Sequence, residues 1–489
     1  MSVRRTFVSG VSSLSKSATA SRQFCTTPSI LGPRAVPCRT GGLPRRCDVG
    51  RRHASTTREG AADARSLVTR LKNVLFGTSI ALFLVSGYYA VTDTRFSLHR
   101  WLVVPLLRYI YDDAEEAHHA TTKALATLYK FGLHPRERGN LDAAGDLQVK
   151  VLGHELQNPI GVSAGLDKSA EIPDQLLSLG CAYVEVGGIT PLPQEGNPKP
   201  RLFRVISQSG LINRFGLNSE GADRVAMRLR ERVREYAHTL GFGADENAEQ
   251  MVLDGEAGVP PGSLVKGKLM AIQIAKNKAT PDDVDSIVRD YVYCVETLSR
   301  YADVIVVNVS SPNTENLRDL QRQEPLTKIL RAVVSAAAKT SRKTKPAVLV
   351  KVSPDEDSKE QVHGICEAIT DSGVDGVIVG NTTKRRPDAL PIGMQLPGRE
   401  AVTMLEQGGY SGPQLFEQTV SLVKRYRQIL DGNLENTELA GSDGISLAAS
   451  EDTEASARKV IFCSGGITNG RQALEALNAG ADLVQIYTG

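Results

Sequence analysis

The sequence lacks any spacing of cysteines that would suit a metal site or a disulfide framework. Three of its seven cysteines lie within the first 60 residues, and the other four are far apart and form no C-x-x-C pair: they are Cys25, Cys38 and Cys47, then Cys181, Cys294, Cys366 and Cys463. Isolated cysteines are typical of reduced thiols in proteins without structural disulfides. We therefore expect no zinc site and no disulfide.

Acidic residues are scarce at the N-terminus. Residues 1–60 contain 11 lysines and arginines but only Asp48 and Glu59, a net charge of +9; because the whole chain carries +3, the other 429 residues carry −6. An acidic main part argues against a nucleic-acid-binding protein. A leader rich in Arg, Ser, Thr and Ala, without a continuous apolar core, is typical of a mitochondrial transit peptide, and a disordered basic tail is the alternative.

Charge is absent from residues 74–91. This 18-residue run, VLFGTSIALFLVSGYYAV, is preceded by Arg70 and Lys72 and followed by Asp93 and Arg95. The run is just long enough to cross a bilayer about 30 Å thick, so it predicts one transmembrane helix. The alternative is a helix buried in a soluble domain, but neither neighbouring segment supplies a partner for its all-round apolar surface.

Residues 95–134 predict two short helices, over about Leu98–Tyr111 and Asp113–Phe131. The first is apolar apart from Arg100 and Arg108, and acidic residues open the second, as suits a helix N-terminus. The pair either lies at the membrane surface and opens a slot for a lipid-soluble molecule, or packs on the main domain as a helical hairpin. The sequence leaves both possibilities open.

Short apolar runs alternate with helical patterns over the main part of the chain, residues 141–489. A hairpin over residues 148–156 comes first, and the runs are Ile160–Ser163, Ala182–Val186, Leu269–Ile274, Val304–Asn308, Ala347–Val352, Gly376–Val379, Val460–Cys463 and Leu483–Ile486. Such runs predict parallel strands buried on both faces, and eight of them predict an α/β fold, the (β/α)₈ or TIM barrel. Residues 431–458, acidic and rich in Ser and Gly, predict a disordered insertion.

Polar residues and glycines follow these runs, at the strand ends that build the active sites of such barrels. Glycine lets a backbone approach a flat ring or a phosphate, amides read rings with alternating donors and acceptors, and lysines balance anionic charge. Ser464-Gly465-Gly466 follows the seventh run, the usual phosphate position of this fold. The strand ends therefore suit a ligand with a flat ring and a phosphate.

Six motifs give the chain a family resemblance. They are AGLDK (164–168), GGITPLPQEGNPKPR (187–201), INRFGLNS (212–219), NVSSPNT (308–314), VLVKVSPD (348–355) and NTT (381–383). In this order they resemble the class 2 dihydroorotate dehydrogenases, which are mitochondrial and quinone-dependent, and the chain resembles the fungal members. The resemblance extends over about residues 95–489, and the predicted anchor and short helices match the membrane-bound class.

The resemblance implies the oxidation of (S)-dihydroorotate to orotate, the fourth step of de novo pyrimidine (UMP) biosynthesis, with FMN as hydride acceptor and ubiquinone as terminal electron acceptor. Ser311 matches the general base that removes the proton from C5, and Lys168 matches the cation beside the substrate carboxylate. The residues implied to read the pyrimidine ring are Asn213, Asn308, Asn313, Asn381 and Thr382. A serine is a poor base alone, so Ser311 needs a neighbouring acceptor or a water to relay its proton.

The resemblance also implies cofactor and quinone contacts. Lys351 matches the lysine that stabilises negative charge on the reduced flavin. The positions implied to surround the flavin ring or its phosphate are Ala164, Gly165, Gly188, Gln273, Asn308, Gly380, Ser411, Gly412, Gly465, Gly466, Tyr487 and Thr488. His118, Arg204 and Tyr487 match positions along the quinone tunnel, although His118 taken alone would be an ordinary exposed residue of a helix.

The chain departs from the family pattern at several positions. Gly188 stands where many relatives have Ser or Thr, Gln273 where an Asn contacts the flavin, and Gly380 where a Thr often precedes the Asn. The resemblance therefore does not imply individual flavin hydrogen bonds through the side chains at these three positions. The sequence ends at Gly489, directly after the eighth predicted strand, where the family continues into a final helix. We expect either a fragment or a truncated product that is unstable or inactive.

Two other functions fit part of the pattern. Another flavin- or phosphate-binding barrel would share the Gly-Gly turn without requiring the motifs and the anchor together, and an inactive membrane-tethered scaffold would bind no flavin. The basic leader favours an N-terminus retained in the matrix. We therefore expect a monomeric, single-pass protein of the mitochondrial inner membrane with its barrel on the intermembrane side.

Overall fold

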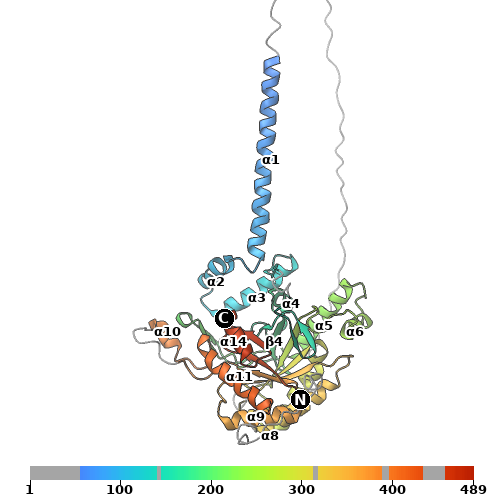
Figure 1. Ribbon diagram of the computed structural model, residues 1–489, viewed down its shortest axis with the longest axis vertical. Coiled ribbons are helices and arrows are strands. Elements are labelled where there is room, and N and C mark those ends of the chain that lie inside the picture. The colour runs from blue at the N-terminus through green and yellow to red at the C-terminus, as the bar shows by residue number, and fades with distance from the viewer. Residues whose placement is uncertain (1–55, 140–144, 312–317, 388–395, 433–457, 489) are drawn as a thin grey trace, which may run out of the picture. The chain divides into compact units, whose positions relative to one another are not determined.

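The computed structural model describes residues 56–139, 145–311, 318–387, 396–432 and 458–488. The predicted transit peptide and the predicted insertion fall almost wholly outside these ranges, as does the candidate residue Asn313. The main domain within them is a barrel with helices between its strands (Figure 1).

Eight parallel strands form the closed barrel, in the cyclic order β3-β4-β7-β8-β9-β10-β12-β13. They are β3 (Ile160–Val162), β4 (Tyr183–Ile189), β7 (Leu269–Ile274), β8 (Val304–Asn308), β9 (Ala347–Val352), β10 (Gly376–Val379), β12 (Val460–Ser464) and β13 (Leu483–Ile486). The pairing of β13 with β3, through Val484 and Ile160, closes the ring. The predicted TIM barrel is confirmed, and each predicted run overlaps one of these strands.

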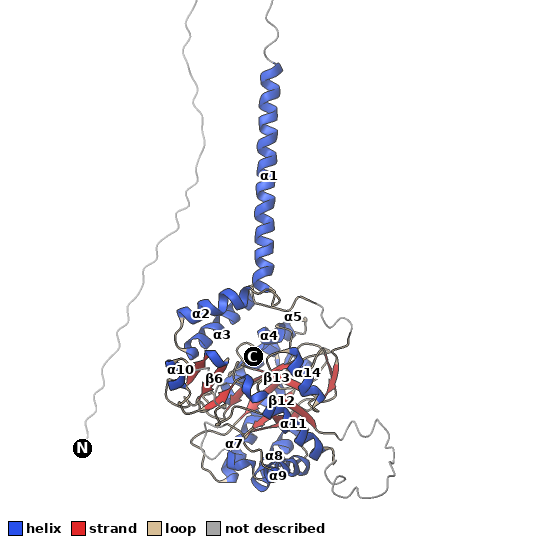
Figure 2. Ribbon diagram, turned by 60° about the vertical axis from the view of Figure 1, so that its left-hand side comes forward, coloured by secondary structure: helices blue, strands red, loops and turns tan. Residues whose placement is uncertain are grey.

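Helices connect the strands and cover the outside of the barrel (Figure 2). They are α4 (Pro173–Ser178), α5 (Ala222–Thr239), α6 (Glu246–Leu253), α7 (Val284–Leu298), α8 (Gln323–Ala338), α9 (Lys359–Ser372), α11 (Phe416–Leu430) and α14 (Gly470–Asn478), with a short helix α10 (Gly398–Thr403) before α11. Their apolar faces recur at helical spacing, as in α7, where Ile287, Tyr291 and Leu298 are buried.

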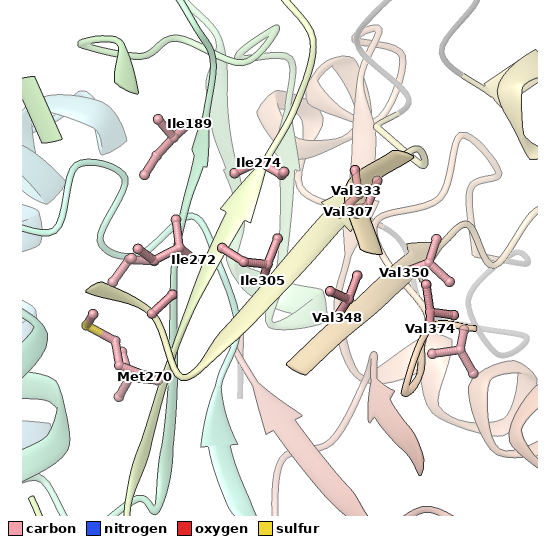
Figure 3. Packing of buried hydrophobic residues seen from close by; sticks show 14 of the residues in the cluster. Ile189, Met270, Ile272, Ile274, Ile305, Val307, Val333, Val348, Val350 and Val374 are labelled. Carbon is pink, nitrogen blue, oxygen red and sulfur yellow. The ribbon is translucent and has the colours of Figure 1, made fainter. Parts of the chain in front are cut away.

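The strand residues divide between two cores because successive side chains point to opposite faces. On β7, Met270, Ile272 and Ile274 point outward and belong to the same buried cluster as Val307 of β8, which Figure 3 shows beside Val333 of α8. Leu269 and Ala271 point inward and join an interior core. The next inward position is Gln273, so the interior changes from apolar to polar toward the carboxyl ends of the strands.

The opposite end of the interior is closed by the predicted hairpin, β1 (Val149–Val151) and β2 (His154–Leu156). Val151 and Leu156 are buried in the interior core together with Tyr183 and Phe462, whose rings meet edge to face with centroids 5.2 Å apart. The lower half of the barrel is therefore a filled apolar core.

A second small sheet lies at the carboxyl end of the barrel, and the sequence analysis did not predict it. It has three antiparallel strands in the order β11-β6-β5: β5 (Leu202–Val205), β6 (Gly210–Asn213) and β11 (Gly409–Ser411). Val205, Ile212 and Tyr410 form its core. The sheet joins two segments that are about 200 residues apart in the sequence.

The N-terminal part of the described chain is helical. Helix α1 (Thr56–Thr92) contains one stretch, Asp63–Thr92, that is long and apolar enough to cross a membrane, and none of its most apolar window is buried. The first predicted short helix corresponds to a π-helical turn, η1 (His99–Val103), that runs into α2 (Val104–Ile110), and the second corresponds to α3 (Ala114–Lys130). Trp101 and Tyr109 are exposed, whereas α3 buries its first turn. The first turn of α3 is therefore covered, the apolar surface of α2 is uncovered in the described residues, and the choice between the two alternatives stays a prediction.

Candidate active site

A cavity opens at the carboxyl ends of the barrel strands. Seventeen of the residues singled out from the sequence line it: Ala164, Gly165, Lys168, Gly188, Asn213, Gln273, Asn308, Ser311, Lys351, Asn381, Thr382, Ser411, Gly412, Gly465, Gly466, Tyr487 and Thr488. They come from segments spread over more than 300 residues of sequence. The barrel therefore gathers most of the predicted site into one place.

The floor of this cavity is a layer of polar side chains above the apolar interior. Glu185 of β4, Gln273 of β7 and Gln485 of β13 lie one inward position beyond the apolar residues of their strands. Gln273 Nε2 donates to Glu185 Oε1 over 2.6 Å, and Gln485 Nε2 donates to Glu185 Oε2 over 2.7 Å. Each carboxylate oxygen of a fully buried glutamate therefore has an amide donor, as the burial of a charge requires.

Lys351 supplies the opposite charge. Its Nζ lies 3.2 and 3.3 Å from the two carboxylate oxygens of Glu185 and donates to Ser163 Oγ over 2.9 Å. Lys351 is almost fully buried but lines the cavity. The ion pair and the hydrogen bond to Ser163 thus fix the position of the Lys351 ammonium group at the cavity.

Amides and hydroxyls continue the network beside the pair. Asn308 Nδ2 donates to Gln273 Oε1 over 2.9 Å, and Asn308 Oδ1 accepts from the backbone N–H and the hydroxyl of Ser310, each at 3.1 Å. Asn381 Nδ2 donates to Ser310 Oγ over 2.7 Å. Ser311 follows directly, and its side chain lines the cavity although the residue is only 8% exposed. Its hydroxyl therefore lies where little solvent reaches.

Lys168 lies on another wall of the cavity. Its Nζ donates to Asn218 Oδ1 over 2.6 Å and lies 3.1 Å from the ring centroid of Phe215, a cation–π contact. Burial, with a further contribution from the nearby Arg201, lowers the pKa of Lys168 to about 7. The lysine is therefore poised to gain charge when an anion binds beside it.

The small sheet completes the opening. Asn213 ends β6 and Ser411 ends β11, and the hydroxyl of Ser411 lies 2.9 Å from that of Thr488 beyond β13. The segment after β12 passes close to the start of α11: Gly466 has a φ of +72°, and a Cβ there would lie 2.4 Å from the backbone nitrogen of Phe416. The glycine turn and a helix N-terminus therefore meet at the cavity, an arrangement suited to a phosphate.

Four of the predicted site residues are placed elsewhere or are not described. Gly380 does not line this cavity; a Cβ there would come within 1.9 Å of the Ser464 carbonyl oxygen, so its glycine serves the approach of β10 to β12. His118 lines a second cavity, between α3 and the barrel. Arg204 lines neither, and its Nη1 donates to the carbonyl of Asp112 over 2.9 Å, while Asn313 lies outside the described residues.

Other residues of the cavity, and Glu185 in the polar layer beneath it, were not identified from the sequence. Glu185 is an acid inside an apolar run, and a charge at an inward position of a doubly buried strand was the available signal. Phe215 and Asn218 belong to the quoted motif INRFGLNS, but their role depends on Lys168, about 50 residues away. Gln485 lies within the eighth run and carried no signal of its own.

Comparisons with known proteins agree with this site. A family model described as dihydroorotate dehydrogenase matches residues 146–452. The mitochondrial dihydroorotate dehydrogenase (quinone) of Lachancea kluyveri is 37% identical over 429 residues, which cover 85% of this chain and 83% of that enzyme. The enzyme of the same name from Mus musculus is 34% identical over 405 residues, covering 83% and 85%.

A solved structure is similar as well. The crystal structure of DHODH from Eimeria tenella, in complex with ferulenol, is 30% identical and superimposes with a TM-score of 0.59, covering 77% of this chain and 86% of that one. The match extends over the barrel and the sequence similarity over most of the chain. The chain therefore belongs to the dihydroorotate dehydrogenase family and, within it, to the mitochondrial quinone-dependent enzymes.

Proposed function

We propose that the chain oxidises (S)-dihydroorotate to orotate with FMN as hydride acceptor, Ser311 as general base and ubiquinone as terminal electron acceptor, in pyrimidine biosynthesis. The observation that carries this proposal is the gathering of Ser311, Lys168 and the amides of Asn213, Asn308 and Asn381 around one cavity. A cation, a hydroxyl and amide groups match a ligand with a carboxylate, an acidic C–H and a pyrimidine dione ring.

The residues of the cavity fit FMN. Gly465 and Gly466 approach the start of α11, where backbone N–H groups can bind the phosphate, and Ala164, Gly165 and Gly188 leave space for a flat ring. Lys351 is held toward that space by Glu185 and Ser163. When bound, the flavin accepts the hydride from C6 of the substrate, and a fixed lysine favours the negative charge that the ring gains.

The remaining work belongs to the chain itself. Lys168 binds the substrate carboxylate, and the amides orient the ring so that C5 faces Ser311. Ser311 Oγ then takes the C5 proton and passes its own proton to a water or a neighbouring acceptor, a relay that needs a site closed to bulk solvent. The low exposure of Ser311 meets that condition.

The second half of the proposed reaction passes the electrons to a quinone. We propose that Tyr487 and the α2–α3 segment, with His118 and Arg204, receive the quinone. Burial lowers the pKa of His118, so its imidazole is neutral at neutral pH. Helix α1 would anchor the chain in the mitochondrial inner membrane, with the barrel on the intermembrane side and the protein a monomer.

The direct test is the anaerobic addition of dihydroorotate to the purified full-length chain. We expect a yellow protein whose flavin absorbance bleaches on addition of the substrate and returns when a ubiquinone is added, whereas fumarate and NAD restore little of it. Absorbance spectra before and after each addition measure this. Colour that persists with dihydroorotate would reject the substrate, and a colourless protein would favour an inactive scaffold.

Gly188 offers a prediction about the shape of the flavin site. A Cβ at this position would lie 3.0 Å from Gln273 Oε1, an atom that Asn308 Nδ2 holds in place. We expect Gly188→Ser to weaken FMN binding about tenfold, or about 1.4 kcal/mol. The Gly188→Ser/Gln273→Asn double variant, whose shorter amide withdraws, should recover most of the loss. Titration of the apoprotein with FMN measures both, and equal losses in the two variants would contradict the steric explanation.

A further inference from the structure

Glu115 and Arg201 form a buried ion pair between helix α3 and the barrel. Arg201 Nε donates to Glu115 Oε2 over 3.0 Å and Arg201 Nη2 donates to Glu115 Oε1 over 2.8 Å, and the two residues are 3% and 5% exposed. The remaining terminal nitrogen, Nη1, donates to the carbonyls of Glu195 and Asn197 over 2.5 and 2.9 Å. This two-point contact fixes α3 to the loop between β4 and β5.

Arg201 also lies close to Lys168, with Phe215 in contact with both. Arg201 Cζ is 5.3 Å and Lys168 Nζ is 3.1 Å from the centroid of the Phe215 ring. The two cations are therefore nearer to each other than the Debye length of about 10 Å in 0.1 M salt, and solvent screens buried charges less than exposed ones. Arg201 lowers the pKa of Lys168 and Glu115 raises it, with burial the largest influence.

We propose that Glu115 is a positioning residue of the substrate site: by neutralising Arg201 it lets Lys168 carry the charge that binds the substrate carboxylate. The inference rests on the proposed function, in which Lys168 binds that carboxylate. Helix α3 would then contribute to substrate binding as well as to the proposed quinone site of the α2–α3 segment. Substrate affinity then depends on whether α3 is seated on the barrel.

Other titratable groups surround Lys168, and none duplicates this arrangement in the described residues. The cavity that Lys168 shares with α3 is lined by His118 and His119 of α3, Asp167 and Glu171 of the segment after β3, Glu195, and Glu220. Asp167 is bound to the backbone N–H groups of Ser169, Glu171 and Ile172. Burial, and after it the charge of Lys168, lowers the pKa of His118 below its usual value of about 6.5. His118 is therefore neutral above that pH, and its titration does not overlap with that of Lys168.

The test is the binding of orotate to the flavin-loaded full-length chain between pH 6 and 8.5, followed by the change in flavin absorbance. In the parent chain, affinity should fall as the pH rises through about 7, because Lys168 loses its proton. In Glu115→Gln the uncompensated Arg201 should move this fall to lower pH, so that orotate binds about 3- to 10-fold more weakly at pH 7.5, equivalent to a pKa lower by about 0.5 to 1 unit.

Two further variants distinguish charge from structure. Arg201→Gln removes the repelling cation and should move the fall in affinity to higher pH, opposite to Glu115→Gln, and the double variant should lie near the parent. Glu116→Gln is the matched control, because Glu116 is the exposed neighbour of Glu115, and its pH profile should not change. If Glu115→Gln fails to load flavin, Glu115→Asp and Arg201→Gln carry the comparison, with Glu115→Asp expected near the parent.

These measurements distinguish a positioning role of Glu115 from a purely structural one, and both from a failure of the proposed function. A contact that only anchors α3 would raise the KM for quinone or lower the melting temperature without moving the pH profile of orotate binding, and an unmoved profile would overturn the inference. Shifts of the two single variants in the same direction would overturn it too. Failure of dihydroorotate to bleach the parent flavin would instead reject the proposed function.

Discussion

Ser311→Ala should leave FMN bound and slow the reduction of the flavin by dihydroorotate by about 10²- to 10⁴-fold, the usual contribution of a positioned acid or base. Ser311 lies in the cavity wall, three residues after Asn308, and the residue is only 8% exposed. Removing its hydroxyl deprives the C5 proton of its acceptor, and the low exposure leaves little room for a bulk water to substitute. Anaerobic stopped-flow absorbance, extrapolated to saturating substrate, measures the limiting rate.

Ser310→Ala is the informative companion to this variant. Ser310 Oγ donates to Asn308 Oδ1 and accepts from Asn381 Nδ2, so its loss should loosen the amides that orient the ring. We expect a higher dissociation constant for dihydroorotate with a smaller change in the limiting rate. Ser311→Ala should do the reverse. An unchanged limiting rate in Ser311→Ala would remove this residue from the role of base.

Lys351→Met should destabilise the barrel by about 3–5 kcal/mol, because it leaves the Glu185 carboxylate buried without its counter-charge. Glu185 would keep the amide donors of Gln273 and Gln485, but these supply no net charge. The same variant should lose flavin affinity, since the fixed cation at the cavity is gone. Urea unfolding of the detergent-solubilised chain measures the first effect, and flavin retained on gel filtration measures the second.

The double variant Lys351→Met/Glu185→Gln separates these effects. A neutral amide at position 185 removes the buried charge, so most of the lost stability should return while flavin affinity stays low. Recovery of both properties together would show that Lys351 acts on the flavin only through the fold. A double variant as unstable as Lys351→Met would contradict the buried-charge explanation.

The barrel was predictable because its signal is local. Each strand is a short apolar run between turns, and eight such runs leave few alternatives. The small sheet was not predictable in the same way, since LFRV and GLIN are brief and partly exposed, and β6 acquires its partner β11 only from a segment about 200 residues away. Its pairing is a property of the folded barrel and not of either segment.

The same difference between local and long-range signals separates the site residues that could be named from the sequence from those that could not. Ser311, Lys168 and Lys351 could be named because they belong to recognisable motifs at strand ends, and the cavity contains all three. Glu185 and Arg201 were missed because a buried charge becomes meaningful only when its partner is known, and those partners, Lys351 and Glu115, are distant in sequence. The roles of all these residues remain predictions, and His118 and Arg204 do not line the main cavity.

The change from apolar to polar layers inside the barrel has a practical consequence for altering this protein. Residues such as Phe462, Leu349 and the hairpin residue Val151 fill the lower layers and do not themselves line the cavity. Substitutions that improve their packing should raise the temperature of unfolding without changing the turnover of substrate. Substitutions confined to these lower layers could therefore give a heat-resistant variant for inhibitor screening whose inhibitor profile is unchanged.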